Sequence, residues 1–238
     1  GADGALYGVG SPATSITGGV IYRATLDGSD VRTLYQLKPE DALSPAGGLV
    51  LASDGLLYGT TKFGQAGQID GAGSIFKIAE AGTGFQIIHR FAPVTASNQD
   101  LNPININGAY PEAELVEGAD GYLYGVARAG GPNGTGTLFK ISRDGADFKL
   151  LHSFAAVTSS STSGLTVTVD GAAPTGPLVA GTDNFFYGTT SQGGANGRGA
   201  VFRIAFDGTG FQVQHEFSAT TADTTTGMLE NEDGATPL

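Results

Sequence analysis

The chain of 238 residues contains four copies of one unit, and this repetition limits its fold more than any other feature. Each copy holds a Tyr-Gly pair, with the tyrosines 51, 66 and 63 residues apart, at Tyr7, Tyr58, Tyr124 and Tyr187. Each also holds a second aromatic residue, spaced by 54, 63 and 63 residues, at Tyr22, Phe76, Phe139 and Phe202. Four copies with such regular spacing indicate a repeat architecture.

The copies consist of short apolar segments that we label a, b, c and d. In the second copy these are GGLVLAS (47–53), DGLLYGT (54–60), GSIFKI (73–78) and FQIIHRF (85–91). Runs of five to seven such residues between Gly, Asp and Asn predict strands. The Asp-Gly pair that opens segment b predicts a tight turn with positive φ at both central positions. No window has sustained helical periodicity, so no long helix is expected.

Apolar residues occur on both faces of the expected strands, as Leu138 and Phe139 show. Such a sheet must be covered on both sides. We therefore predict an all-β fold, a β-propeller of four blades built from repeats of about 60 residues and closed into a small ring. A β-solenoid is the alternative. The expected blades are 1–43, 44–109, 110–172 and 173–232, with a partial strand at 233–238.

One blade lacks a complete strand. The first copy has segments b, c and d, and the last residues, NEDGATPL, break off inside a segment a. An open blade exposes unpaired backbone groups. The chain is then a fragment, or a ring that closes imperfectly, or a molecule that takes a strand from a neighbour. In the third case the assembly edge is formed by Leu6, Tyr7, Thr236, Pro237 and Leu238. Copies of the chain would then join head to tail into a fibre.

Charge and composition exclude several partners. The net charge of −11 argues against nucleic acid, which needs clustered Lys and Arg. No apolar stretch reaches the roughly 18–20 residues of a transmembrane helix, so membrane insertion is not expected. Because the chain has no Cys, it can form neither disulfides nor thiolate metal sites.

No catalytic, cofactor-binding or metal-binding residues are predicted. The chain has no nucleophile-elbow or P-loop motif. His89, His152 and His215 repeat in successive d segments, which places them on different blades and favours packing over zinc binding. The Asp residues before segments b repeat in the same way and fit a role in turns. The acidic residues at 230, 232 and 233 lack the DxDxDG spacing of a calcium loop, so a solvated loop is favoured.

The long loops are where any ligand is expected. The b–c and d–a loops should share one face of the ring, and three d–a loops are long, at 92–110, 155–173 and 218–236. Phe63, Tyr110 and Asn133 are the candidate ligand residues there. Asn133 also begins an N-x-T sequon, a candidate N-glycosylation site, and the Ser/Thr clusters at 158–163 and 219–226 could carry O-linked sugars.

The run LYGTT, a Gly-rich link, GTLFKI and LLHSF resembles the bacterial GloVer tandem repeat over nearly the whole chain, best at 57–61, 136–141 and 150–154. The first copy departs from the pattern, because Tyr35 stands where the other copies have His. The resemblance implies a propeller-like fold in a protein outside the bacterial cell or on its surface. Such proteins commonly carry a C-terminal anchor, which these residues lack. The resemblance implies no activity.

These observations favour a non-enzymatic, extracellular structural or adhesive protein that assembles with copies of itself. A carbohydrate-binding module that uses the long-loop face is the alternative. A polysaccharide-active enzyme is a third hypothesis, although no pair of acidic residues supports it.

Overall fold

The computed structural model describes residues 1–11, 18–38, 40–41, 43–64, 71–94, 96–97, 103–160, 165–222, 229–231, 233–234 and 237. Within these ranges every regular element is a strand, and the chain is all-β. Each repeat forms one antiparallel sheet, and three small hairpins are added. The described part contains no helix of the length and hydropathy needed to cross a membrane.

The four sheets follow the predicted segments. The first comprises β1 (Leu6–Gly10), β2 (Val20–Ala24) and β3 (Val31–Gln36). The second comprises β4 (Leu43–Leu51), β5 (Leu56–Phe63), β6 (Ser74–Ala79) and β7 (Gln86–Arg90). The third comprises β10 (Val116–Glu117), β11 (Leu123–Ala127), β12 (Thr137–Ile141) and β13 (Phe148–Ser153). The fourth comprises β16 (Ala172–Pro174), β17 (Val179–Ala180), β18 (Phe185–Gln192), β19 (Ala200–Ala205) and β20 (Gln212–Glu216).

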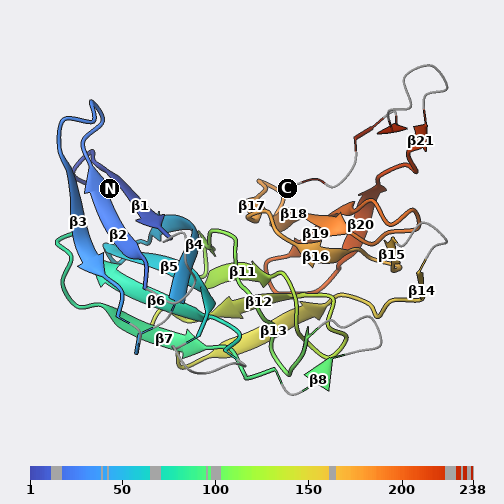
Figure 1. Ribbon diagram of the computed structural model, residues 1–238, viewed down its shortest axis with the longest axis horizontal. Coiled ribbons are helices and arrows are strands. Elements are labelled where there is room, and N and C mark those ends of the chain that lie inside the picture. Colours follow the sequence, from blue (N-terminus) through green and yellow to red (C-terminus); the bar gives the residue numbers. More distant parts are fainter. Residues whose placement is uncertain are drawn as a thin grey trace.

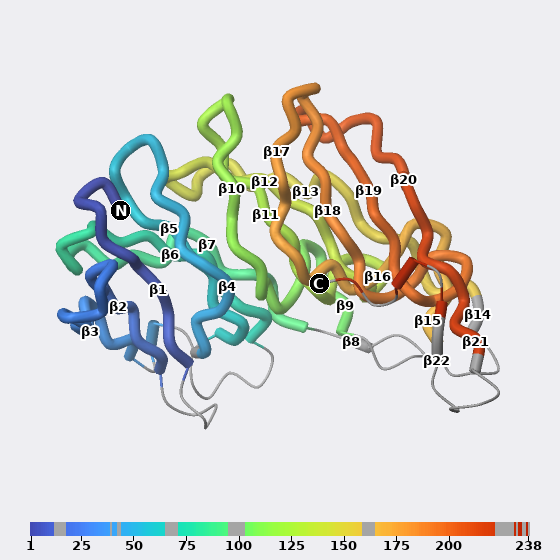
Figure 2. Tube along the Cα trace, turned by 90° about the horizontal axis from the view of Figure 1, so that it is seen from above, coloured from blue at the N-terminus to red at the C-terminus, as the bar shows by residue number. Residues whose placement is uncertain are grey.

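The sheets are the blades of a β-propeller, and they form an open arc (Figure 1). The first blade has three strands in the order β1-β2-β3, so its segment b is the edge strand, as predicted. The expectation that four blades close a ring is wrong for this structure. The first and fourth blades stand apart at the two ends of the arc in both Figure 1 and Figure 2.

Three hydrophobic clusters hold the arc together, one at each junction between neighbouring blades. Successive residues of a strand belong to different clusters because side chains alternate between the faces of a sheet. Leu57 packs toward the first blade, whereas Tyr58 packs toward the third. Phe139 likewise packs toward the second blade and Leu138 toward the fourth. The prediction that both faces of each inner sheet are covered is confirmed.

The Tyr-Gly pair of segment b has a packing reason. Each of these glycines lies opposite the aromatic residue of the neighbouring strand, as Gly125 pairs with Phe139. A Cβ at Gly125 would lie 2.8 Å from the tip of the Phe139 ring and 2.6 Å from Leu115. The ring therefore crosses the strand only where a side chain is missing. In every blade the pairing between segments c and d also shifts at the residue before this aromatic.

The Asp-Gly turns differ from the prediction in one respect. Gly4, Gly55 and Gly121 have φ between 73° and 77°, but no Asp of these turns has positive φ. The Asp side chain instead accepts a hydrogen bond from the backbone N–H two residues later, as Asp54 does from Leu56 at 3.1 Å. The turn is thus fixed by the carboxylate and the glycine together.

The long d–a loops contain hairpins that the sequence analysis did not predict. These are β8 (Ala96–Ser97) with β9 (Pro103–Ile104), β14 (Ser159–Ser160) with β15 (Thr166–Val167), and β21 (Thr221–Ala222) with β22 (Leu229–Glu230). They lie along one side of the molecule, away from the tips of the short turns (Figure 2). The expected separation into a short-turn face and a long-loop face is therefore present.

Candidate functional site

One ring contact recurs at every junction between blades. The fifth residue of segment d stacks on the first residue of the next segment d. The centroid separations are 4.3 Å for Tyr35 with Phe85, 4.2 Å for His89 with Phe148, and 3.7 Å for His152 with Phe211. The ring planes are within 10° of parallel in each pair. His89 and His152 are thus packing residues between blades.

A residue 18 positions later in the chain holds each histidine in place. His152 Nε2 lies 2.8 Å from Asp170, and His215 Nε2 lies 2.7 Å from Asp233. In the second blade the partner is Asn107, whose Nδ2 lies 3.3 Å from Nε2 of His89. Desolvation by burial lowers the pKa of His89 to about 4. His89 is therefore a neutral ring at neutral pH.

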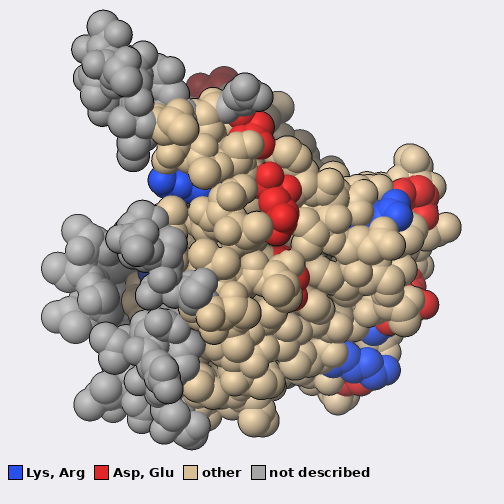
Figure 3. All heavy atoms as spheres, turned by 90° about the vertical axis from the view of Figure 1, so that its right-hand side faces the viewer, with Lys and Arg blue, Asp and Glu red and all other residues tan. Residues whose placement is uncertain are grey.

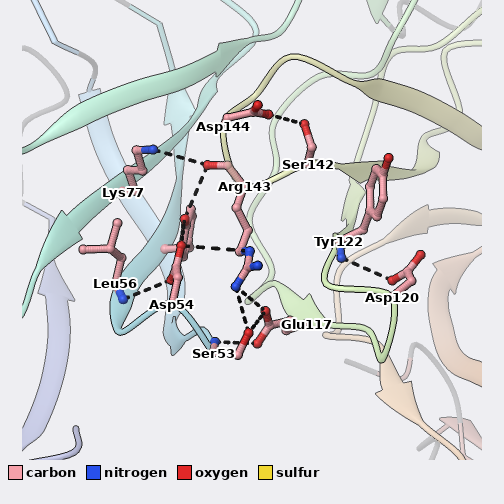
Figure 4. A network of polar contacts seen from close by, with 11 residues as sticks. Ser53, Asp54, Leu56, Lys77, Glu117, Asp120, Tyr122, Ser142, Arg143 and Asp144 are labelled. Carbon is pink, nitrogen blue, oxygen red and sulfur yellow. Dashed lines mark hydrogen bonds and ion pairs between the residues drawn. The ribbon is translucent and has the colours of Figure 1, made fainter.

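On the short-turn face, polar contacts join the second and third blades (Figure 4). The Arg143 guanidinium reaches the hydroxyl of Ser53 at 2.8 Å and the carboxylate of Glu117 at 3.3 Å. Ser53 donates to Glu117 through its N–H at 2.7 Å and through its hydroxyl at 2.8 Å. The Tyr58 hydroxyl lies 2.8 Å from Asp54 and 3.3 Å from the carbonyl of Arg143. Burial and the neighbouring Asp54 raise the pKa of Tyr58, which keeps the phenol protonated.

At the free end of the fourth blade, one half of this junction has no partner among the described residues. His215 is presented by Asp233 as His152 is by Asp170, but no ring stacks on it there, and its side chain is 50% exposed. Val169, Val213, Gln214 and Glu216 lie beside it on an open, shallow surface. Figure 3 faces the right-hand side of Figure 1, where uncharged residues cover much of the visible surface and a band of Asp and Glu residues crosses its middle.

The first blade presents the other half. Val31 occupies the place of Phe85, Phe148 and Phe211 at the start of segment d, and it is 64% exposed. Leu26, in the turn before it, is 77% exposed. A Cβ added at Gly28 would meet nothing within 4 Å, whereas one added at Gly82 would lie 2.7 Å from Leu34 of the preceding blade. This surface was not predicted, although in the four aligned d segments Val31 stands where the other three copies have Phe.

The described residues of the predicted assembly edge, Leu6, Tyr7 and Pro237, lie on different blades. Leu6 and Tyr7 lie in β1, and Tyr7 contacts Asp3 at 3.2 Å. Pro237 instead lies against Gly199 of the fourth blade, as Pro174 lies against Gly136 of the third. Thr236 and Leu238 lie outside the described residues. Strand addition at β1 stays a prediction.

Two of the three predicted ligand residues meet on the long-loop face. Phe63 and Tyr110 pack edge to face, with their centroids 5.7 Å apart. Asn133 lies apart from this contact, in a turn of the third blade, where its side-chain amide donates 2.8 Å to the carbonyl of Phe154. Asn196 makes the equivalent bond to Phe217 at 3.0 Å in the fourth blade. Asn133 thus has a structural role, and its glycosylation stays a prediction.

A cavity of about 110 Å³ opens on this face between the third and fourth blades. Its lining includes Tyr110, Arg128, Thr166, Ala173 and Gln192. No group of three or more His, Asp or Glu side chains within the described ranges is arranged to hold a metal ion.

Several solved structures are similar to this fold. A nidogen/laminin complex matches with 15% identity and a TM-score of 0.50, over 98% of this chain and 70% of that one. TolB from Acinetobacter baumannii matches with 14% identity and a TM-score of 0.48, over 92% and 43% of the two chains. The periplasmic gluconolactonase PpgL of Pseudomonas aeruginosa matches with 14% identity and a TM-score of 0.49, over 91% and 56%. The chain thus spans about half the length of the last two proteins, and likeness at this identity concerns the fold alone.

No relative was found among curated proteins. The profile of the Gloeobacter/Verrucomicrobia repeat matches residues 1–170, which is most of the chain and includes the motifs of the first two blades and most of the third. The chain therefore belongs to the Gloeobacter/Verrucomicrobia repeat family.

Proposed function

We propose that this chain is a non-enzymatic structural repeat protein that associates head to tail with copies of itself, outside the cell or on its surface. The fourth blade of one molecule packs on the first blade of the next. The observation that carries this proposal is that the same junction forms three times within the arc. One half of a further junction is exposed on the first blade and the other half on the fourth blade, without a partner among the described residues.

The two free surfaces complement each other. Asp233 holds His215 by the same hydrogen bond with which Asp170 holds His152, on which Phe211 stacks. His215 therefore loses little side-chain freedom on association. Val31 and Leu26 of a second molecule would bury apolar surface that is now exposed. A contact between two different patches is heterologous, and it forms a ring if the rotation closes and a filament if it does not.

The test is the mass of the 238-residue chain in solution, measured by light scattering over a range of protein concentrations. We expect the mass to rise above that of one chain as the concentration increases. The double variant Leu26→Asp/Val31→Asp should remain monomeric, because two buried, unpaired carboxylates oppose association. Ile106→Asp is the matched control, since Ile106 is as exposed as Leu26 but lies on a long loop, and it should behave like the unmodified chain.

A monomer at every concentration would overturn the proposal. Equal association of the double variant and the unmodified chain would overturn it as well, and would point instead to strand addition at β1.

A further inference from the structure

The cavity on the long-loop face exists because two aromatic rings of one junction are replaced by methyl groups at the next. Between the second and third blades, the space is filled by Phe63 and Tyr110. Between the third and fourth blades, the same places are taken by Ala129 and Ala173. Ala129 lies five residues after the tyrosine of segment b, as Phe63 does, and Ala173 lies directly before the proline of segment a, as Tyr110 does. Both alanines line the cavity of about 110 Å³.

The backbone at the rim does not distinguish this junction from the others. Tyr110 and Ala173 have φ values of 58° and 52°, but Ser44 has 55° at the equivalent place in the second blade. The positive φ therefore belongs to the blade design, and the side chains alone set the cavity apart.

The charge of the two junctions differs in the same region. At the filled junction Lys62 forms an ion pair with Glu112 at 2.6 Å. The equivalent residues at the open junction are Arg128 and Thr175. This junction therefore has a cationic side chain but no carboxylate at the position of Glu112. Arg128 lines the cavity, and its guanidinium makes no ion pair with any described residue. The Thr175 hydroxyl is buried and likewise has no hydrogen-bond partner in the described part of the chain.

We propose that this cavity binds a small carboxylate, either a free acid or the acid group of a sugar residue, which pairs with Arg128 as Glu112 pairs with Lys62 at the filled junction. Arg128 offers a planar pair of N–H donors that matches a carboxylate. Tyr110, Thr166 and Gln192, whose side chains carry polar groups, line the same cavity. The volume has room for a carboxylate and the atoms next to it, while the rest of a larger molecule extends through the rim.

The net charge of −11 does not prevent this binding. Charges on distant parts of the surface are screened over about 8 Å at physiological ionic strength, whereas Arg128 would touch the ligand. The charge does select against polyanions that extend over the acidic surface, and it favours a ligand with one carboxylate.

The test is calorimetric titration of the 238-residue chain with glucuronate, glucose and acetate, together with NMR observation of arginine Nε–H signals. We expect glucuronate to bind with a Kd on the order of 1 mM and to shift the Arg128 signal, while glucose gives no response. Acetate as strong as glucuronate would assign the site to free acids, and weaker acetate would assign it to acidic sugars.

Two variants and a control make the assignment specific. Arg128→Gln should weaken binding at least about tenfold, because the charged donor is lost. Ala129→Phe should also abolish binding, because it restores the ring that fills the preceding junction. Lys62→Gln, at the filled junction, should leave the affinity unchanged. Absence of binding by both acids, or binding that survives Arg128→Gln, would overturn the proposal.

Discussion

The imidazole of His152 lies parallel to the ring of Phe211 in the next blade, with the centroids 3.7 Å apart and the planes 5° apart. Phe211 also contacts Phe154 and Phe202, so one residue from the fourth blade completes an aromatic cluster that the third blade begins. The same ring stacking recurs at each junction of the arc and helps to hold neighbouring blades together.

Removing the Phe211 ring should therefore loosen a junction. We expect Phe211→Ala to lower the free energy of unfolding by about 2–3 kcal/mol, less than for a fully buried Phe because the residue is half-buried. Val31→Ala is the control at the equivalent position of the free end, where about 0.5 kcal/mol or less is expected. Urea unfolding at low protein concentration measures both. Equal losses would contradict the role assigned to the junction.

Substitutions at two equivalent glycines, Gly28 and Gly145, distinguish the cost of backbone strain from the cost of a clash between blades. Gly28 and Gly145 occupy the same turn in the first and third blades, with φ of 71° and 81°. An added Cβ would overlap the Ile88 carbonyl at Gly145 and would meet nothing at Gly28. We expect Gly28→Ala to cost about 1 kcal/mol from φ alone, and Gly145→Ala to cost about 2–4 kcal/mol. Thermal unfolding would refute the close contact if the two variants lost the same stability.

His89 should make stability depend on pH. Its folded pKa of about 4 is below the unfolded value of 6.5, so between these values the unfolded chain binds the proton and the folded chain does not. The free energy of unfolding should fall as the pH drops from 6.5 to 4, by about 1–2 kcal/mol after allowance for the exposed part of the ring. Comparison of the unmodified chain with His89→Gln isolates this share from that of the carboxylates. An identical pH dependence of the two proteins would show the assignment to be wrong.

A related substitution tests the cause of the lowered pKa. Asn107→Asp would give His89 the partner that His152 and His215 already have, and a carboxylate favours the protonated ring. We expect NMR titration to show a higher pKa for His89 in this variant. A value that stays at about 4 would mean that burial alone decides it.

The Arg143 network should contribute modestly and respond to salt. The side chains of Arg143 and Glu117 are 33% and 17% exposed, so solvent screens the pair only in part. A double-mutant cycle with Arg143→Ala and Glu117→Ala should give a coupling of about 0.5–1 kcal/mol that shrinks at high ionic strength. A coupling of zero at low salt would remove this pair from the forces that join the second and third blades.

The sequence predicted the fold class because each repeat carries its pattern in short, contiguous segments. Alternation placed Leu138 and Phe139 on opposite faces, and the structure packs them into different clusters. Whether the blades close into a ring could not be predicted from the sequence, because the angle between blades depends on how side chains from two repeats pack together. The hairpins of the long loops were not predicted because strands of two residues are too short to show a periodicity.

The candidate sites were predictable only in part. The pairing of Phe63 with Tyr110 depends on the register between two repeats, and the empty junction beside it becomes visible only when Ala129 and Ala173 are aligned with those rings. Val31 aligns with the phenylalanines that begin the other three d segments. Once the stacking of these phenylalanines is known, the alignment predicts that the surface at Val31 has no stacked partner. The histidine partners 18 residues away were not anticipated, since a long loop separates them.

These histidine partners also fix the bases of the long loops. Besides holding the rings, Asn107, Asp170 and Asp233 accept the backbone N–H of the residue that follows segment d. The two stems of each loop are thereby tied to the blade. The sequences between them differ freely, as TASNQDLN (95–102), TSSSTSGL (158–165) and TADTTTGM (221–228) show. The tips of these loops can therefore change in sequence one at a time, because the hydrogen bonds at their bases do not depend on the residues between them.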